Sequence, residues 1–149
     1  MEVLAAFDPG KGGGVSWQDA EGSFHASAFP KVPRDLVQLV KNINPTDSVI
    51  EAVGGYQGDE EKSTGSRMFQ FGYYAGAPYW ILLTLGKRVR FVTPQKWQRS
   101  LSLGQRKTYG AKWKNHLKTI ASDRFPLITV SLATADSLLM LDAMIQKLI

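Results

Sequence analysis

The sequence predicts one α/β domain over residues 1–149, in which a five-stranded mixed sheet is flanked by helices. Short apolar runs bounded by turn residues gather near the start of the chain, and longer segments with helical periodicity follow them. A chain of this length corresponds to about one domain and can bury a sizeable core without crosslinks. It contains no cysteine, so disulfides and thiolate sites are excluded.

The first three strands are predicted to form an antiparallel meander. Residues 3–7 make an apolar run that ends in the turn residues Asp8-Pro9-Gly10, and residues 15–17 follow three successive glycines. Residues 23–29 alternate in polarity after a turn at residues 19–22, which is the pattern of a strand paired with its neighbour.

The rest of the chain is predicted to contain two further strands and several helices. Pro33 opens a helix that residues 42–45 end. Strands are predicted at residues 48–53 and 88–92, and a polar loop at residues 54–65 leads into a long, largely apolar helix at 66–85. A short helix starts at Pro94, a strongly basic helix covers residues 107–125, and a last helix runs from about Ala133 to the C-terminus.

Positive charge is concentrated in one part of the chain. Twelve Lys and Arg residues, but no Asp or Glu, lie between Lys62 and Ser122, so this window has a formal charge of +12. The net charge of +5 therefore leaves −7 for the rest of the chain. Such segregation predicts a surface for a polyanion, above all nucleic acid; a solvated basic surface is the alternative.

Three carboxylates are the candidate catalytic residues. Asp8 ends the first predicted strand, Glu51 interrupts an apolar run, and Asp136 lies in an otherwise apolar helix. A charge in such surroundings needs compensation, and clustered carboxylates suit Mg²⁺ or Mn²⁺. Taken singly, Asp8 could instead be an Asx-turn residue, and Asp136 a capping or solvated residue.

Other common sites are not predicted. The glycine-rich segment after Phe7 lacks the Gly-Lys-Ser/Thr ending of a P-loop. The two histidines, His25 and His116, are far apart in sequence, and no Ser-His-Asp arrangement can be nominated. The most apolar stretch, residues 79–85, is too short to cross a bilayer, and the N-terminus lacks the layout of a signal peptide. We therefore expect a cytoplasmic protein that does not bind membranes.

Six further segments follow one another along the chain. They are Asp-Pro-Gly-x-x-Gly-Gly from Asp8, the Glu51 strand, the loop into Ser63-Thr64 with Phe69-x-Phe71-Gly72, Val92-Thr93-Pro94-Gln95-Lys96-Trp97, the basic helix closed by Phe125-Pro126, and Ala135-Asp136-Ser137-Leu138-Leu139. Taken in order, these segments resemble the RuvC-type Holliday-junction resolvases, most closely the branch found in bacteriophages and chloroplasts. The resemblance implies an RNase H-like fold, a homodimer, and paired Mg²⁺-dependent nicks across a four-way DNA junction. It also implies a bacterial or phage source, or a mature chloroplast form.

By the same resemblance, Asp8, Glu51 and Asp136 match the acidic metal ligands, and residues 54–64 match the segment that enters the junction centre. The basic helix matches a segment with phosphate contacts, where Lys107 or Lys112 would neutralise charge on the cleaved phosphate. The predicted DNA contacts are Lys11, Lys62, Ser63, Thr64, Arg67, Lys96, Arg106, Lys107, Lys112, Lys114 and Lys118.

One position departs from the family pattern. These enzymes usually carry a further acidic residue or a histidine three or four positions before the last carboxylate, where this chain has Ala133 and Leu132. Asp142 is not expected to replace it, because six residues along a helix turn a side chain to a different face.

The predicted reaction is phosphodiester hydrolysis by a metal-activated water, with two metal ions roughly 4 Å apart. The long helix at residues 66–85 is predicted to form the dimer interface through Phe69, Tyr73, Tyr74 and Trp80. Two alternatives stay open: a non-catalytic protein that binds branched DNA, and a nuclease that acts on flaps, forks or RNA–DNA hybrids.

Overall fold

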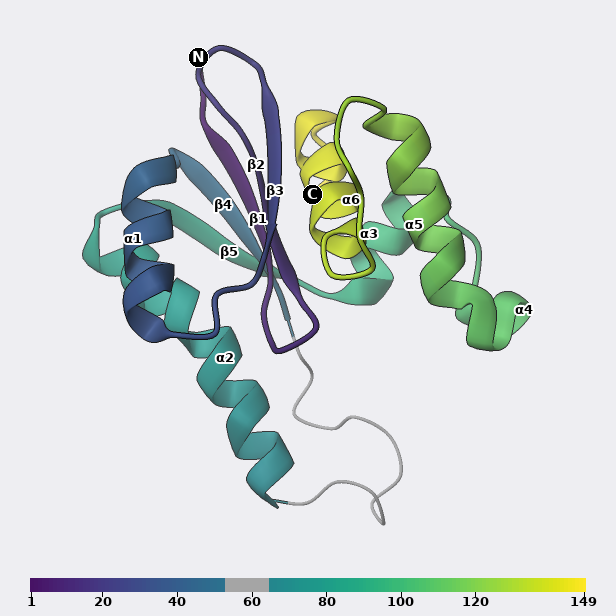
Figure 1. Ribbon diagram of the computed structural model, residues 1–149, viewed down its shortest axis with the longest axis horizontal. Coiled ribbons are helices and arrows are strands. Elements are labelled where there is room, and N and C mark those ends of the chain that lie inside the picture. Colours follow the sequence, from purple (N-terminus) through teal and green to yellow (C-terminus); the bar gives the residue numbers. More distant parts are fainter. Residues whose placement is uncertain (53–64) are drawn as a thin grey trace.

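A computed structural model describes residues 1–52 and 65–149 and contains the predicted five-stranded mixed sheet (Figure 1). The strands lie in the order β3-β2-β1-β4-β5, with bounds β1 (Leu4–Asp8), β2 (Gly14–Gln18), β3 (Phe24–Ala28), β4 (Asp47–Glu51) and β5 (Arg88–Val92). The first three pair antiparallel, and β1, β4 and β5 run parallel. The predicted fold class is therefore confirmed.

Helices cover both faces of the sheet. Figure 1 shows α1 (Pro33–Ile43) and α2 (Gly65–Thr84) on one side, and α3 (Pro94–Ser100), α5 (Trp113–Arg124) and α6 (Ala135–Ile145) on the other. Successive strand residues contribute to two separate hydrophobic cores, because side chains alternate between the faces of a sheet. Phe7 and Ile50 pack with α1 and α2, whereas Ala6 and Val49 pack with the helices of the other face.

Helix α6 lies deepest in the molecule. Nine of its residues are buried, and it packs on β1, β2 and α5. Its buried Ser137 hydroxyl lies 2.7 Å from that of Ser16 on β2, so both polar groups are satisfied inside the core. This close packing brings the start of α6 to the edge of the sheet where β1 ends.

The prediction of one continuous basic helix over residues 107–125 is wrong. The structure has α4 (Arg106–Tyr109), a single 3₁₀ turn η1 (Gly110–Lys112), and then α5. Gly110 causes the break, because its φ of 52° lies outside the helical region and its missing side chain makes that conformation accessible.

Most other predicted bounds agree with the structure to within one or two residues. The last helix is shorter than predicted: it starts at Ala135, after a turn in which Ser131 and Thr134 bond each other, and it ends at Ile145 instead of at the C-terminus. The end of the strand predicted at residues 48–53 lies outside the described residues, as does most of the loop at 54–65. Within residues 1–52 and 65–149, no helix is both long and apolar enough to cross a membrane.

Candidate active site

Asp8, Glu51 and Asp136 come from three elements and meet at one edge of the sheet. Asp8 is the last residue of β1 and Glu51 the last of β4. These strands are parallel neighbours in which Phe7 pairs with Ile50, so the two carboxyl groups follow side by side. Phe7 and Ile50 face α1 and α2, and side chains alternate along a strand. Asp8 and Glu51, one residue further on, therefore face α6. Asp136 occupies the first turn of α6.

Two glycines allow close backbone packing at the end of β1, Gly14 against the segment before α6 and Gly13 against Asp8 itself. A Cβ atom at Gly14 would lie 2.4 Å from the carbonyl oxygen of Ala133, just before α6. One at Gly13 would lie 1.9 Å from the carbonyl oxygen of Asp8. The glycine run therefore serves close backbone packing around Asp8 and not the cradling of a phosphate.

Lys114 joins the carboxylates from the first turn of α5. Its Nζ lies 2.6 Å from Oδ2 of Asp136, whose side chain is only 7% exposed, whereas the Lys114 side chain is 61% exposed. The other oxygen of Asp136, Oδ1, is buried and has no hydrogen-bond partner among residues 1–52 and 65–149. A buried carboxylate oxygen without a partner is costly and is a natural point for a cation or water to bind.

Trp97 holds Glu51 from α3. Its indole Nε1 donates a hydrogen bond of 2.8 Å to Oε2 of Glu51, and the ring itself is fully buried. Helix α3 is anchored at its start, where Thr93 caps the backbone N–H of Lys96. A rigid donor therefore fixes one oxygen of Glu51.

Burial and mutual repulsion make it unfavourable for Asp8, Glu51 and Asp136 to be negatively charged at the same time. Burial raises the pKa of Asp8 to about 8, with repulsion from Glu51 and Asp136 adding to it and Lys114 reducing it. Burial likewise raises the pKa of Glu51 to about 7, against the opposing effect of the Trp97 hydrogen bond. Burial lowers the pKa of Lys114, but attraction to Asp136, Asp8 and Glu51 outweighs it, so the net direction is upward.

The donor set suits a hard divalent cation such as Mg²⁺ or Mn²⁺. It consists of carboxylate oxygens, one of them buried and unpartnered, and two of the carboxyl groups have pKa values raised by burial and by neighbouring negative charge. Within residues 1–52 and 65–149, no three His, Cys, Asp or Glu side chains lie close enough together to hold one ion. Electrostatic coupling nevertheless links the three carboxyl groups to one another and to Lys114.

The other predicted site residues fall into three groups. Lys107 in α4 and Lys112 in η1 are exposed, and the lysine brought to the carboxylates is Lys114, which the sequence predicted only as a DNA contact. Lys62, Ser63 and Thr64 lie outside the described residues. The remaining predicted DNA contacts are exposed or partly buried, and they are Lys11, Arg67, Lys96, Arg106 and Lys118.

The position of the usual fourth ligand holds no carboxylate or imidazole here. Leu132 is half exposed, and the backbone of Ala133 lies against Gly14. Asp142 is engaged elsewhere, since it forms an ion pair with Arg124 and accepts a hydrogen bond from Gln146. The expectation that Asp142 does not complete the carboxylate cluster therefore agrees with the structure.

No protein-family model matches the sequence, and no curated protein matches it. Solved structures do resemble it. RuvC from Thermus thermophilus has a TM-score of 0.59 at 16% identity, over 97% of this chain and 96% of that one. The same protein in complex with a Holliday junction substrate has a TM-score of 0.61 at 13% identity, over 92% and 89%. The fowlpox virus Holliday junction resolvase is a weaker likeness, with a TM-score of 0.46 at 11% identity over 99% of both chains. The two RuvC likenesses show that this chain has the RNase H-like fold in the form that RuvC adopts.

Proposed function

We propose that the protein is a structure-selective endonuclease that resolves four-way DNA junctions by paired, metal-dependent hydrolysis of phosphodiester bonds. One observation carries the proposal: Asp8, Glu51 and Asp136 gather around Lys114 at one edge of a RuvC-like sheet. Three buried or partly buried carboxylates at one place serve no evident purpose in packing, and strongly shifted pKa values are typical of functional sites.

In this proposal Asp8, Glu51 and Asp136 hold Mg²⁺ or Mn²⁺, two ions per site. The metal would supply a deprotonated water and would stabilise charge on the attacking and leaving oxygens. Asp136 would contribute its Oδ1, which has no hydrogen-bond partner among the described residues, and Asp8, which interacts electrostatically with both Glu51 and Asp136, would bridge the two ions. Trp97 limits the freedom of Glu51 by fixing one of its oxygens.

Lys114 is the residue of this chain that we expect to stabilise charge on the cleaved phosphate. Its stem is long and largely exposed, so the ammonium can leave Asp136 and reach a bound phosphate. Lys107 and Lys112, the sequence-based candidates for that role, lie at the adjoining turn and would contact neighbouring phosphates.

Helix α2 supports a dimer. Phe69, Tyr73 and Trp80 are 75%, 54% and 67% exposed, an unusual degree for aromatic side chains on one helix. Met68 and Leu83 on the same helix are also exposed. A two-fold dimer through this face would present two identical sites to two equivalent strands of a junction.

A second candidate function is a junction-binding protein without nuclease activity. The ion pair between Lys114 and Asp136 favours it, because a lysine here replaces a cation near the carboxylates. The absence of an acidic residue or a histidine at Leu132 and Ala133 points the same way.

A substrate panel separates these possibilities. Labelled four-way junctions, flaps, forks, linear duplexes and RNA–DNA hybrids are incubated with Mg²⁺, Mn²⁺ or EDTA, and products are resolved on denaturing gels. We expect symmetric nicks in the junction with either metal and none with EDTA. Junction binding without nicking would support the second candidate, and equal cleavage of linear duplex would exclude a junction resolvase.

A further inference from the structure

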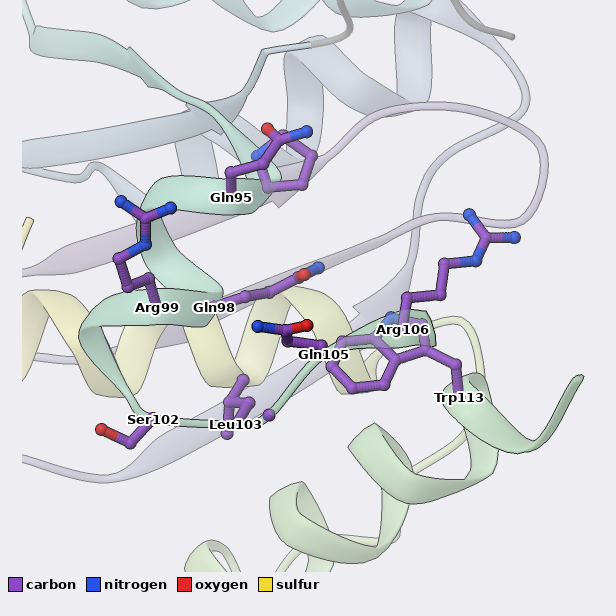
Figure 2. Close-up of a pocket in the computed structure, with 10 residues that line it drawn as sticks. Gln95, Gln98, Arg99, Ser102, Leu103, Gln105, Arg106 and Trp113 are labelled. Carbon is purple, nitrogen blue, oxygen red and sulfur yellow. The ribbon is translucent and has the colours of Figure 1, made fainter. Parts of the chain in front are cut away.

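An open cavity lies between α3, residues 102–105 and the starts of α4 and α5 (Figure 2). Its volume is about 850 Å³, within the range of roughly 300–1,000 Å³ that is typical of small-molecule sites. In Figure 2 the side chain of Gln98 extends from α3 toward Gln105, and Arg99 and Arg106 stand on opposite sides.

The lining is rich in unused hydrogen-bonding groups. Gln95, Gln98 and Gln105 supply three amides, and two guanidinium groups come from Arg99 and Arg106. Among the residues that the structure describes, no Asp or Glu lines the cavity, and none of these five side chains makes a hydrogen bond. Guanidinium groups bind phosphate, and an amide offers both a donor and an acceptor to the edge of a nucleobase.

Contacts from α4 and α5 fix the shape of the loop at residues 102–105, which forms one wall of the cavity. Nε2 of His116 lies 2.8 Å from the carbonyl oxygen of Leu103 and must be the donor, because a carbonyl oxygen only accepts. The ring of Tyr109 stacks on His116 at 3.8 Å and lies against Gly104, whose φ of 89° shapes the turn. A wall braced in this way is preorganised, which lowers the entropic cost of binding a ligand.

The cavity shares two elements with the carboxylate cluster. Gln98 follows Trp97, which donates to Glu51, and Trp113 in the cavity wall precedes Lys114, which pairs with Asp136. The carboxylate cluster and the cavity are therefore built one residue apart on each of two helices, which places the cavity next to the proposed cleavage site.

We propose that this cavity binds one nucleotide of the cleaved DNA strand, next to the scissile phosphate. Arg99 and Arg106 bind its phosphate, and Gln98 and Gln105 contact its base, so the cavity contributes to the sequence preference of cleavage. This inference rests on the proposed nuclease function. It adds a contact that differs from the predicted junction-entering segment at residues 54–64.

The first arm of the test needs no catalysis. A 5′-phosphorylated DNA dinucleotide is titrated into the protein in EDTA, and the indole N–H signal of Trp113, assigned with Trp113→Phe, is followed by NMR. The signal should shift on titration in the unsubstituted protein, and affinity should fall about tenfold or more in the double variant Arg99→Gln/Arg106→Gln. An unchanged Trp113 signal in the unsubstituted protein would overturn the proposal, and so would equal affinity in the double variant. A matched RNA dinucleotide that binds more tightly would overturn the assignment to DNA.

The second arm uses junctions in which the nucleotides around the cut are randomised, and the cut products are sequenced. Among the products that form, the double variant Gln98→Leu/Gln105→Leu should lose the base preference at one flanking position. Gln38→Leu, an exposed position on α1 across the sheet, is the control and should keep the full preference. An unchanged profile in the cavity variant would overturn base contact. If no junction is nicked, the proposed function fails, and the first arm still decides whether the cavity binds a nucleotide.

Discussion

Nζ of Lys114 lies 2.6 Å from Oδ2 of Asp136, and the same ammonium attracts Asp8 and Glu51. One flexible, largely exposed side chain thus provides positive charge beside three carboxylates that two strands and the deepest helix hold in place. The ammonium competes with the proposed metal for the carboxylates, but it would attract the proposed phosphate, so Lys114 is the residue at which metal binding and catalysis can be separated.

Lys114→Met should separate these two roles. Without the competing ammonium, Mg²⁺ should bind more tightly, and its half-saturating concentration should fall severalfold. Nicking at saturating Mg²⁺ should nevertheless fall about 100-fold, because charge on the phosphate loses its partner. Calorimetric Mg²⁺ titration and single-turnover nicking measure the two effects. Lys41→Met on α1 is the control, and weaker Mg²⁺ binding in Lys114→Met would contradict the competing role.

Gly14→Ala should displace the start of α6. The new Cβ would lie 2.4 Å from the carbonyl oxygen of Ala133, a backbone atom that cannot move away without shifting the helix. We expect a loss of about 1–3 kcal/mol in the free energy of unfolding, measured by urea denaturation, together with weakened Mg²⁺ binding. Gly12→Ala is the matched control, since nothing lies within 4 Å of its Cβ position. Equal stability of the two variants would show that α6 tolerates the shift.

The effect of pH on stability follows from the raised pKa values of Asp8 and Glu51. A carboxyl group whose folded pKa is raised stabilises the protein fully below its unfolded pKa of about 4, and this contribution is lost as pH rises through the folded pKa. With folded pKa values of about 8 and about 7, the metal-free protein should lose stability between about pH 4 and pH 8.

Mg²⁺ should therefore raise the Tm more at pH 8.5 than at pH 6, since it binds the deprotonated carboxylates. Thermal unfolding at both pH values, with Mg²⁺ and with EDTA, measures the difference. Asp8→Asn should remove most of it, whereas Asp35→Asn on the exposed side of α1 should retain it. A Tm shift that is larger at pH 6 would be incompatible with the carboxylate site.

The apolar face of α2 predicts a dimer that one charge can disrupt. Trp80 is 67% exposed, and Trp80→Glu would place two like charges in a two-fold interface. Dimer affinity should fall at least about 100-fold, as measured by sedimentation equilibrium. Leu127→Glu, at a position 99% exposed away from α2, should leave the association unchanged. A protein that is monomeric without any substitution would rule out this interface.

Asp8, Glu51 and Asp136 could be predicted from the sequence because each leaves a local signal. A charge that ends or interrupts an apolar run must be compensated, and alternation along the strands places Asp8 and Glu51 on the face that α6 covers. Both strands were predicted because their apolar runs are short and bounded by turn residues.

Lys114 and Trp97 could not be assigned in the same way, because their partners are distant in sequence. Lys114 bonds a residue 22 positions away, and Trp97 one 46 positions away. The family resemblance pointed to Lys107 or Lys112 in one continuous helix, whereas the break at Gly110 puts these two residues in α4 and η1 and starts α5 at Trp113, next to Lys114. Tertiary packing decides which lysine of a basic segment reaches a buried carboxylate.

The most direct test of the central claim is Asp8→Asn on a labelled four-way junction with Mg²⁺. The substitution removes one candidate metal ligand and keeps the size of the side chain, and no predicted phosphate contact is lost. We expect the nicking rate to fall about 100-fold or more, while junction affinity, measured by gel shift in EDTA, stays within a few-fold of the original. Nicking at the original rate by Asp8→Asn would contradict a carboxylate-held metal site as the source of the activity.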